Sequence, residues 1–189
     1  MASETYISID TETTGPCPGI NSMLSLGAAV FYADGSEGPT FYATLKELSD
    51  GNPYQPTLDW WRTQPKAYKW ATDKPSNPEL VMADFVQWCR EITGRKVPVA
   101  WPAAFDFGFV NYYCWRFAGE NPLGFGCMDL RSLVMGLHHT KGYYNLKDAK
   151  IKELAVDRTG LREHHALDDS IEQGRLLVQI MGLKKEETK

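Results

Sequence analysis

Three β-rich segments joined by short turns occupy the first 45 residues of the chain. They lie at residues 6–10, 23–32 and 40–45, and turn-forming residues fill the gaps at 15–19 and 34–36. Apolar runs bounded by glycine, proline, aspartate and serine predict strands. Because consecutive strands joined by short turns pair antiparallel, we expect this part of the chain to form an antiparallel meander.

The rest of the chain has the periodicity of helices around one further strand. Residues 77–94 predict a helix, with Asn77 as a candidate N-cap, Pro78 as the first helical residue and Gly94 as a stop. Its expected buried face consists of Leu80, Val81, Phe85, Trp88, Cys89 and Ile92. Further helices are expected at 56–64, 105–117, 146–155 and 166–181, and a strand at 97–101. This order predicts an α/β fold in which helices flank a mixed central sheet.

Length and composition fit one soluble domain. We expect it to cover residues 1–182 and to be followed by a charged tail at 183–189. The net charge of −4 argues against a protein that coats duplex DNA. It remains compatible with an enzyme that binds only a strand end, because such an enzyme needs few phosphate contacts and can use bound cations.

The four cysteines and the N-terminus bear on the compartment. Cys17, Cys89, Cys114 and Cys127 form no CxxC pair, which favours reduced, mostly buried thiols over a disulfide framework or a zinc site. The chain shows neither a secretory leader nor an apolar run of membrane length. We therefore expect a cytoplasmic protein with no membrane partner.

Asp10 and Glu12 form the first candidate site. They lie two residues apart at the end of the first expected strand, so their side chains point to the same side of it. Two close carboxylates repel each other unless a cation lies between them, and hard divalent ions prefer oxygen ligands. Alone, the pair is also compatible with two solvated acids at a strand end.

Asp106 and the segment 164–169 add two further candidates. Asp106 follows the strand expected at 97–101, where an acid could simply complement the dipole of a helix. Its aromatic neighbours argue against this explanation alone, because burying a carboxylate among apolar groups is costly. His164 and Asp169 flank the start of the last helix, where an imidazole and an acid can converge. An imidazole beside a bound water can act as a general base, although capping by Asp168 or Asp169 is an alternative.

Taken together, the motifs resemble the DEDDh exonuclease family of the ribonuclease H-like fold, which includes proofreading subunits of bacterial replicative polymerases. The matching segments are YISIDTETTG (6–15), LSLGAAV (24–30), AAFDFGFVN (103–111), CMDLRSL (127–133) and HHALDD (164–169). They cover most of the chain in the family's order. The resemblance implies a mixed sheet with an antiparallel meander and parallel strands, and 3′→5′ exonuclease activity.

The resemblance also implies the site. Asp10, Glu12, Asp106 and Asp169 would hold two Mg²⁺ or Mn²⁺ ions, with His164 as the general base. Asp10 would bridge the ions, Glu12 and Asp169 would complete one position, and Asp106 would hold the other. In this family the histidine lies five residues before the last aspartate, which selects His164. A sister branch has tyrosine four residues before it, at the position of His165. His165 and Asp168 would then be supporting or capping residues.

Substrate contacts are expected from four residues. By resemblance, Glu12 and the backbone near Thr13 lie beside the terminal sugar. TLDWWRTQ (57–64) is similar to a segment of a phage and bacterial branch that includes RNA-directed members. We expect one of its tryptophans to pack in the core and assign the substrate contact to Trp61. Trp101 replaces a polar residue common in the family, and it could stack on a base or be buried at the strand end.

The expected substrates are single-stranded RNA or DNA 3′ ends, released as nucleoside 5′-monophosphates. Relatives that act alone on RNA are often dimers, so a homodimer is expected to be possible. Two alternatives remain open at this point. One is a metal-dependent endonuclease or phosphodiesterase on the same fold, and the other is a nucleic-acid-binding scaffold without catalysis. Products shortened stepwise from a labelled strand would favour the exonuclease over both.

Overall fold

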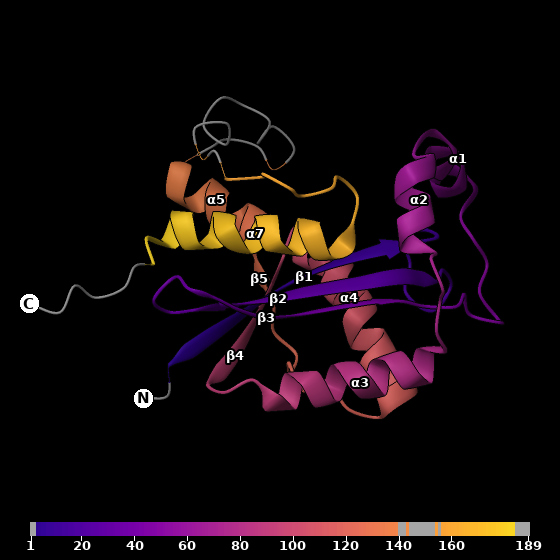
Figure 1. The fold of residues 1–189 in the computed structure, drawn as a ribbon, viewed down its shortest axis with the longest axis horizontal. Coiled ribbons are helices and arrows are strands. Elements are labelled where there is room, and N and C mark those ends of the chain that lie inside the picture. The colour runs from indigo at the N-terminus through magenta and orange to yellow at the C-terminus, as the bar shows by residue number, and fades with distance from the viewer. Residues whose placement is uncertain (1–2, 140–142, 144–153, 155, 184–189) are drawn as a thin grey trace, which may run out of the picture.

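A computed structural model of the 189-residue chain describes residues 3–139, 143, 154 and 156–183. Its centre is a five-stranded sheet in the order β3-β2-β1-β4-β5 (Figure 1). The strands are β1 (Glu4–Thr13), β2 (Met23–Tyr32), β3 (Glu37–Thr44), β4 (Arg95–Ala100) and β5 (Met128–Asp129). The β1–β2 and β2–β3 pairs are antiparallel, whereas β1–β4 and β4–β5 are parallel. The predicted fold class is confirmed.

Helices cover both faces of this sheet. They are α1 (Gln55–Thr63), α2 (Pro65–Ala71), α3 (Pro78–Glu91), α4 (Ala103–Tyr113), α5 (Leu130–His138) and α7 (Ala166–Met181), and the π-helical turn η1 (Cys114–Ala118) extends α4. The helices α3 and α4 pack against one face, and α5 and α7 against the other (Figure 1).

The alternation of β1 divides its side chains between the two faces. Ile7 and Ile9 join the core beneath α3 and α4, whereas Tyr6 joins the core beneath α5 and α7. Because side chains alternate along a strand, the even-numbered Asp10 and Glu12 follow Tyr6 toward α7. Thr11 points toward α4. The strand therefore presents functional side chains to two different helices.

Two glycines allow α7 to lie close to the sheet. A Cβ at Gly27 of β2 would come within 2.2 Å of backbone atoms of Ala166 and Leu167. A Cβ at Gly174 of α7 would come within 1.9 Å of the Phe31 ring. Gly27 is also the partner of Asp10 in the β1–β2 register. The close approach at Gly27 thus brings the N-terminal turn of α7 over the part of β1 that carries Asp10.

Most expected elements are present, with some differences in extent. The helix predicted at 166–181 has those bounds, and Gly119, at the end of the α4–η1 segment, has a φ of 71°. The first strand continues three residues beyond the predicted end at Asp10. The helices α2 and α5 and the short strand β5 were not predicted. Leu80 was wrongly assigned to the buried face of α3, because it is 64% exposed in the first turn.

Other expectations concern the termini and thiols. The helix predicted at 146–155 lies outside the described residues except for Leu154, and so does the predicted tail except for Leu183, which packs on the core beneath α7. Cys89 and Cys114 are buried free thiols, whereas Cys17 is exposed. Within the described ranges, none of the helices combines the length and apolarity needed to span a membrane.

Candidate active site

Four carboxylates from three elements meet at the end of β1. Asp10 and Glu12 come from β1, Asp106 from the first turn of α4, and Asp169 from the first turn of α7. One oxygen of Glu12, one oxygen of Asp169 and a ring nitrogen of His164 lie within 4.8 Å of one another. The structure therefore brings together residues that are more than 150 positions apart in the sequence.

Asp106 is held by β1. The backbone N–H of Thr11 donates to Asp106 Oδ1 at 3.0 Å, and Thr11 Oγ1 donates to the same oxygen at 2.9 Å. At the start of α4, the backbone N–H of Ala103 donates to Asp129 Oδ2 at 2.8 Å. These bonds fix both the beginning of the helix and its carboxylate relative to the sheet.

Asp10 is held by α7. Gln173 Nε2 donates to Asp10 Oδ1 at 2.9 Å across the interface between the helix and the strand. One turn earlier on α7, the Asp169 backbone N–H donates to the carbonyl of His165 at 2.9 Å. The helix thus orients one carboxylate of β1 and contributes another of its own.

Burial raises the pKa values of all four acids, and the charges of neighbouring acids add to this effect. Burial, followed by the charges of Asp106, Glu12 and Asp169, raises the pKa of Asp10 well above its usual range. Burial and the neighbouring acids raise the pKa of Glu12 to about 8.

The other two acids have the same dominant cause. Burial raises the pKa of Asp106 to about 7 although the Thr11 bonds lower it, and burial followed by the charge of Glu172 raises the pKa of Asp169 to about 7. Four acids in such a site are costly without a compensating positive charge.

Two of the acids, Asp10 and Asp169, border a cleft of about 630 Å³, here called the catalytic cleft. Its walls include Asp10, Trp101, Arg158, His164, Asp169 and Gln173. Trp101 is half-buried, packing in part on the core beneath α7. The Trp101 ring, predicted to contact substrate, therefore lines the same cleft as Asp10 and Asp169.

The two adjacent histidines have different environments. His164 has a φ of 57°, in the left-handed region that is costly for residues other than glycine, and its side chain is 36% exposed beside Asp169. The His165 side chain is only 3% exposed, stacks on Tyr42 at 4.4 Å, and accepts a hydrogen bond from the Asp168 backbone N–H at the start of α7. His164 is thus the histidine near the carboxylates, and His165 is the capping residue.

The tryptophan pair of α1 is divided between core and surface. Trp61 is 3% exposed and donates from Nε1 to the carbonyl of Thr13 at 2.9 Å. Trp60 is 38% exposed and meets the His164 ring edge to face at 4.9 Å. The assignment of the substrate contact to Trp61 is not supported, because its buried ring has no open face for a base. Trp61 instead fixes the backbone at Thr13.

The donor set fits a hard divalent cation. Carboxylate oxygens are the ligands preferred by Mg²⁺ and Mn²⁺, and a cation between these acids would offset the repulsion that raises their pKa values. The same cluster contains an imidazole nitrogen, which divalent transition metals also accept.

Comparison with known proteins gives the family. The model of the 3′-5′ exoribonuclease Rv2179c-like domain family matches residues 5–181. The chain belongs to this family. The 3′-5′ DNA exonuclease Cap18 of Escherichia coli is 28% identical to it over 180 residues, which are 92% of this chain and 89% of the relative. The predictions of an enzyme and of 3′→5′ exonuclease activity are confirmed.

Solved structures share the fold of this exonuclease. The nuclease domain of 3′hExo, a DEDDh family member bound to rAMP, matches with a TM-score of 0.71 and 12% identity, covering 95% of this chain and 92% of that one. The Mg²⁺- and Mn²⁺-bound form of S. pombe Pop2p matches with a TM-score of 0.66 and 14% identity, covering 94% and 82%. The predicted resemblance to DEDDh exonucleases is confirmed.

Sequence reasoning missed three residues around this candidate site. Thr11 and Gln173 bind the carboxylates of Asp106 and Asp10, and Trp60 borders His164. The position of Thr11 between Asp10 and Glu12 was a usable signal, because a strand residue there must face the opposite helix layer. No sequence signal separates Gln173 from an ordinary solvated glutamine.

Proposed function

We propose that this exonuclease hydrolyses single-stranded RNA or DNA from the 3′ end in a reaction that depends on two divalent cations. Water attacks the phosphorus of the last phosphodiester, the bond to the upstream O3′ breaks, and a nucleoside 5′-monophosphate leaves. The remaining strand keeps a 3′-hydroxyl and can enter the next cycle. The family and the fold support the 3′→5′ direction.

The observation that carries the proposal is the convergence of four acids beside one histidine, with Glu12 and Asp106 buried and Asp10 and Asp169 partly buried. Burying one unpaired carboxylate is costly, and grouping four adds repulsion to that cost. A structural role does not require such a group. Binding of cations does require it, because the charge of the cations offsets both the cost of burial and the repulsion between the acids.

Asp10, Glu12, Asp106 and Asp169 would hold the two Mg²⁺ or Mn²⁺ ions. When bound, the ions would stabilise the negative charge that develops on the attacking and leaving oxygens. The hydrogen bonds from Thr11 to Asp106 and from Gln173 to Asp10 keep one oxygen of each carboxylate occupied. They therefore orient the other oxygen of each group and reduce the reorganisation needed on binding.

His164 would remove a proton from the attacking water through an unprotonated ring nitrogen. Its support is position: the ring lies beside Glu12 and Asp169 and faces the catalytic cleft. The edge-to-face contact of this ring with Trp60 limits its orientations. A general base of this kind contributes about 10²–10⁴-fold to a rate.

The terminal nucleoside would lie between Trp60 and Trp101. The Trp60 ring is exposed beside His164, and the half-buried Trp101 lines the cleft. Glu12 and the backbone at Thr13 would contact the sugar, and the bond from Trp61 to the Thr13 carbonyl keeps that backbone in place. Stacking on aromatic rings needs an unpaired base, so a single-stranded end is the expected substrate.

RNA and DNA both remain within the proposal. The family description names an exoribonuclease, whereas the relative Cap18 is named a DNA exonuclease. Formation of a homodimer also remains a prediction.

The test uses 5′-labelled single-stranded RNA, single-stranded DNA and blunt duplexes of matched sequence, with Mg²⁺, Mn²⁺ or EDTA. The expected result is a ladder shortened by single nucleotides from the 3′ end of the single strands, only with metal. A strand whose 3′-hydroxyl is blocked by a 3′-phosphate should react much more slowly. Internal cleavage of both the free and the blocked strand would favour an endonuclease and contradict the proposal.

A further inference from the structure

Two additional hollows continue from the catalytic cleft along the surface. The middle hollow, of about 370 Å³, shares Glu163 and His164 with the cleft and is otherwise lined by the α1–α2 junction, including Lys66. The outer hollow, of about 350 Å³, shares Trp70 with the middle one. Because each hollow shares lining residues with the next, the three lie in a row that begins at the catalytic cleft. Both volumes fall within the usual range of small ligand sites.

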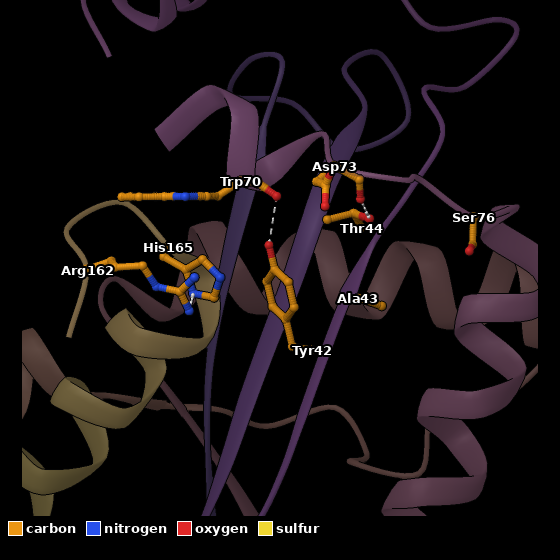
Figure 2. Close-up of a pocket in the computed structure, with 8 residues that line it drawn as sticks. All are labelled: Tyr42, Ala43, Thr44, Trp70, Asp73, Ser76, Arg162 and His165. Atoms are coloured by element: carbon orange, nitrogen blue, oxygen red, sulfur yellow. Dashed lines mark hydrogen bonds between the residues drawn. The ribbon is translucent and has the colours of Figure 1, made fainter. Parts of the chain in front are cut away.

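The outer hollow is built from three segments that are distant in sequence. Figure 2 shows Tyr42 of β3, Trp70 of α2, and Arg162 and His165 from the segment before α7 around it. Tyr42 Oη donates to the carbonyl of Trp70 at 3.0 Å, and the Tyr42 ring stacks on His165 at 4.4 Å. These contacts tie the three segments together, so the hollow has a defined shape.

Trp70 and Arg162 give this hollow the groups that bind unpaired nucleotides. The Arg162 guanidinium lies over the Trp70 ring, 5.4 Å from its centroid. Its Nε donates to Asp168 at 2.6 Å, which holds the side chain in place. Aromatic rings stack on any base, and arginine adds both cation–π attraction and attraction for phosphate. Asp168 offsets part of the charge of Arg162, so we expect stacking on Trp70 to contribute more to nucleotide binding than attraction for phosphate.

The middle hollow adds an exposed cation between the cleft and Trp70. Lys66 lies at its edge, and within the described part of the chain no carboxylate is within ion-pair distance of it. Glu163 also lines this hollow, with its side chain 78% exposed. A phosphate leaving the acidic cleft would therefore meet its first unpaired lysine here.

We propose that the middle and outer hollows form an upstream-strand groove, which holds nucleotides on the 5′ side of the nucleotide in the catalytic cleft. This inference rests on the proposed function and names the path of its substrate. The occupant is a single strand of RNA or DNA, because a base must be unpaired to stack on Trp70. Continuity with the cleft through His164 and Glu163 is the argument for this occupant.

The test compares two substrates that differ in reach. The 4-nitrophenyl ester of thymidine 5′-monophosphate has no upstream nucleotide, whereas a strand of about ten nucleotides is long enough to cover the groove. For the strand, Lys66→Glu should raise KM about 5-fold or more and weaken its dependence on salt, with little change in kcat. The KM for the ester should change far less. RNA and DNA strands are assayed in parallel to show which one uses the groove.

Two further variants separate binding from folding. Lys96 lies near the start of β4 and lines none of the three hollows. Lys96→Glu changes the net charge by the same amount as Lys66→Glu and should leave the KM for the strand unchanged. Trp70→Leu should raise KM for the strand selectively, and Trp70→Phe should restore much of it. Thermal melts of each variant check the fold.

Equal changes in KM for both substrates, or no change for either in Lys66→Glu, would overturn the groove. Absence of metal-dependent cleavage of both substrates by the wild-type protein would instead overturn the proposed function.

Discussion

Thr11 donates two hydrogen bonds to a single oxygen of Asp106, at 3.0 Å from its backbone nitrogen and 2.9 Å from its hydroxyl. The residue lies between Asp10 and Glu12 on β1, yet it points to the opposite face of the sheet. One short stretch of strand therefore contributes two acids on the α7 side and orients a third on the α4 side. Because side chains alternate along β1, residues of one strand contact both α4 and α7 at this site.

Replacing Thr11 should weaken the site without removing an acid. Thr11→Val loses the hydroxyl bond, so the Asp106 carboxylate is less restrained and less favoured in its charged form. We expect the Mg²⁺ concentration for half-maximal activity to rise about 10-fold or more. Thr11→Ser keeps the hydroxyl and should stay close to wild type. An equal loss in both variants would show that the hydroxyl bond does not matter.

The two histidines should respond differently to replacement by alanine. His164→Ala should lower kcat about 10²–10⁴-fold while changing the melting temperature little, since its side chain is partly exposed. His165→Ala removes a buried ring that stacks on Tyr42 and caps α7, so its main effect should be a lower melting temperature. Steady-state kinetics and thermal melts on both proteins measure this contrast, and a reversed pattern would assign the base to His165.

Without metal, stability should fall as pH rises. The pKa of Glu12 is raised from 4.5 to about 8 in the folded protein, so the folded state holds a proton that the unfolded state releases between these values. The pKa values of Asp106 and Asp169 are raised from 3.8 to about 7 and act in the same direction. The unfolding free energy in EDTA should therefore decrease from pH 5 to pH 8.

Melts of the metal-free protein across that range measure the slope. Glu12→Gln removes one of the groups whose pKa is raised, so it should flatten the slope. Adding Mg²⁺ at pH 8 should restore the stability of the wild-type protein. Asp84→Asn, which neutralises an exposed acid of α3, provides the matched control and should keep the wild-type slope. A slope of the opposite sign would mean that the acids are not clustered in the metal-free protein.

Gly27 should tolerate no side chain. Its Cβ would lie 2.2 Å from backbone atoms of Ala166 and Leu167, so Gly27→Ala must displace the start of α7 from the sheet. We expect a loss of about 2 kcal/mol or more in unfolding free energy, together with lower activity because Asp169 moves with the helix. Gly136→Ala is the matched control. In α5, its Cβ would have no described atom within 4 Å, and stability should be unchanged or slightly increased.

The acids could be predicted from local rules, whereas their neighbours could not. The period of a strand relates Asp10 to Glu12, and a short apolar strand followed by a helix locates Asp106. The choice between His164 and His165 rested on the family's spacing. In the structure it reflects the left-handed turn at His164 and the burial of His165 against Tyr42, which are both tertiary features.

The tryptophans of α1 show more clearly what cannot be predicted from the sequence. Adjacent helix residues point in different directions, so the sequence predicts that Trp60 and Trp61 differ but not which one is buried. The answer depends on where α1 packs against the end of β1, because Trp61 reaches the Thr13 carbonyl. Gln173 was equally inaccessible to prediction, since its amide becomes a partner of Asp10 only when α7 lies on the sheet.

The central claim is that acids from β1, α4 and α7 act as a single site, and a double-mutant cycle tests it most directly. Release of nucleoside 5′-monophosphates from a single strand would be measured for Asp106→Asn, Asp169→Asn and the double variant. Because groups that act as a unit are strongly non-additive, each single variant should lose about 10³-fold or more and the double variant little further. Near-wild-type activity in either single variant, or losses that multiply in the double variant, would contradict the account.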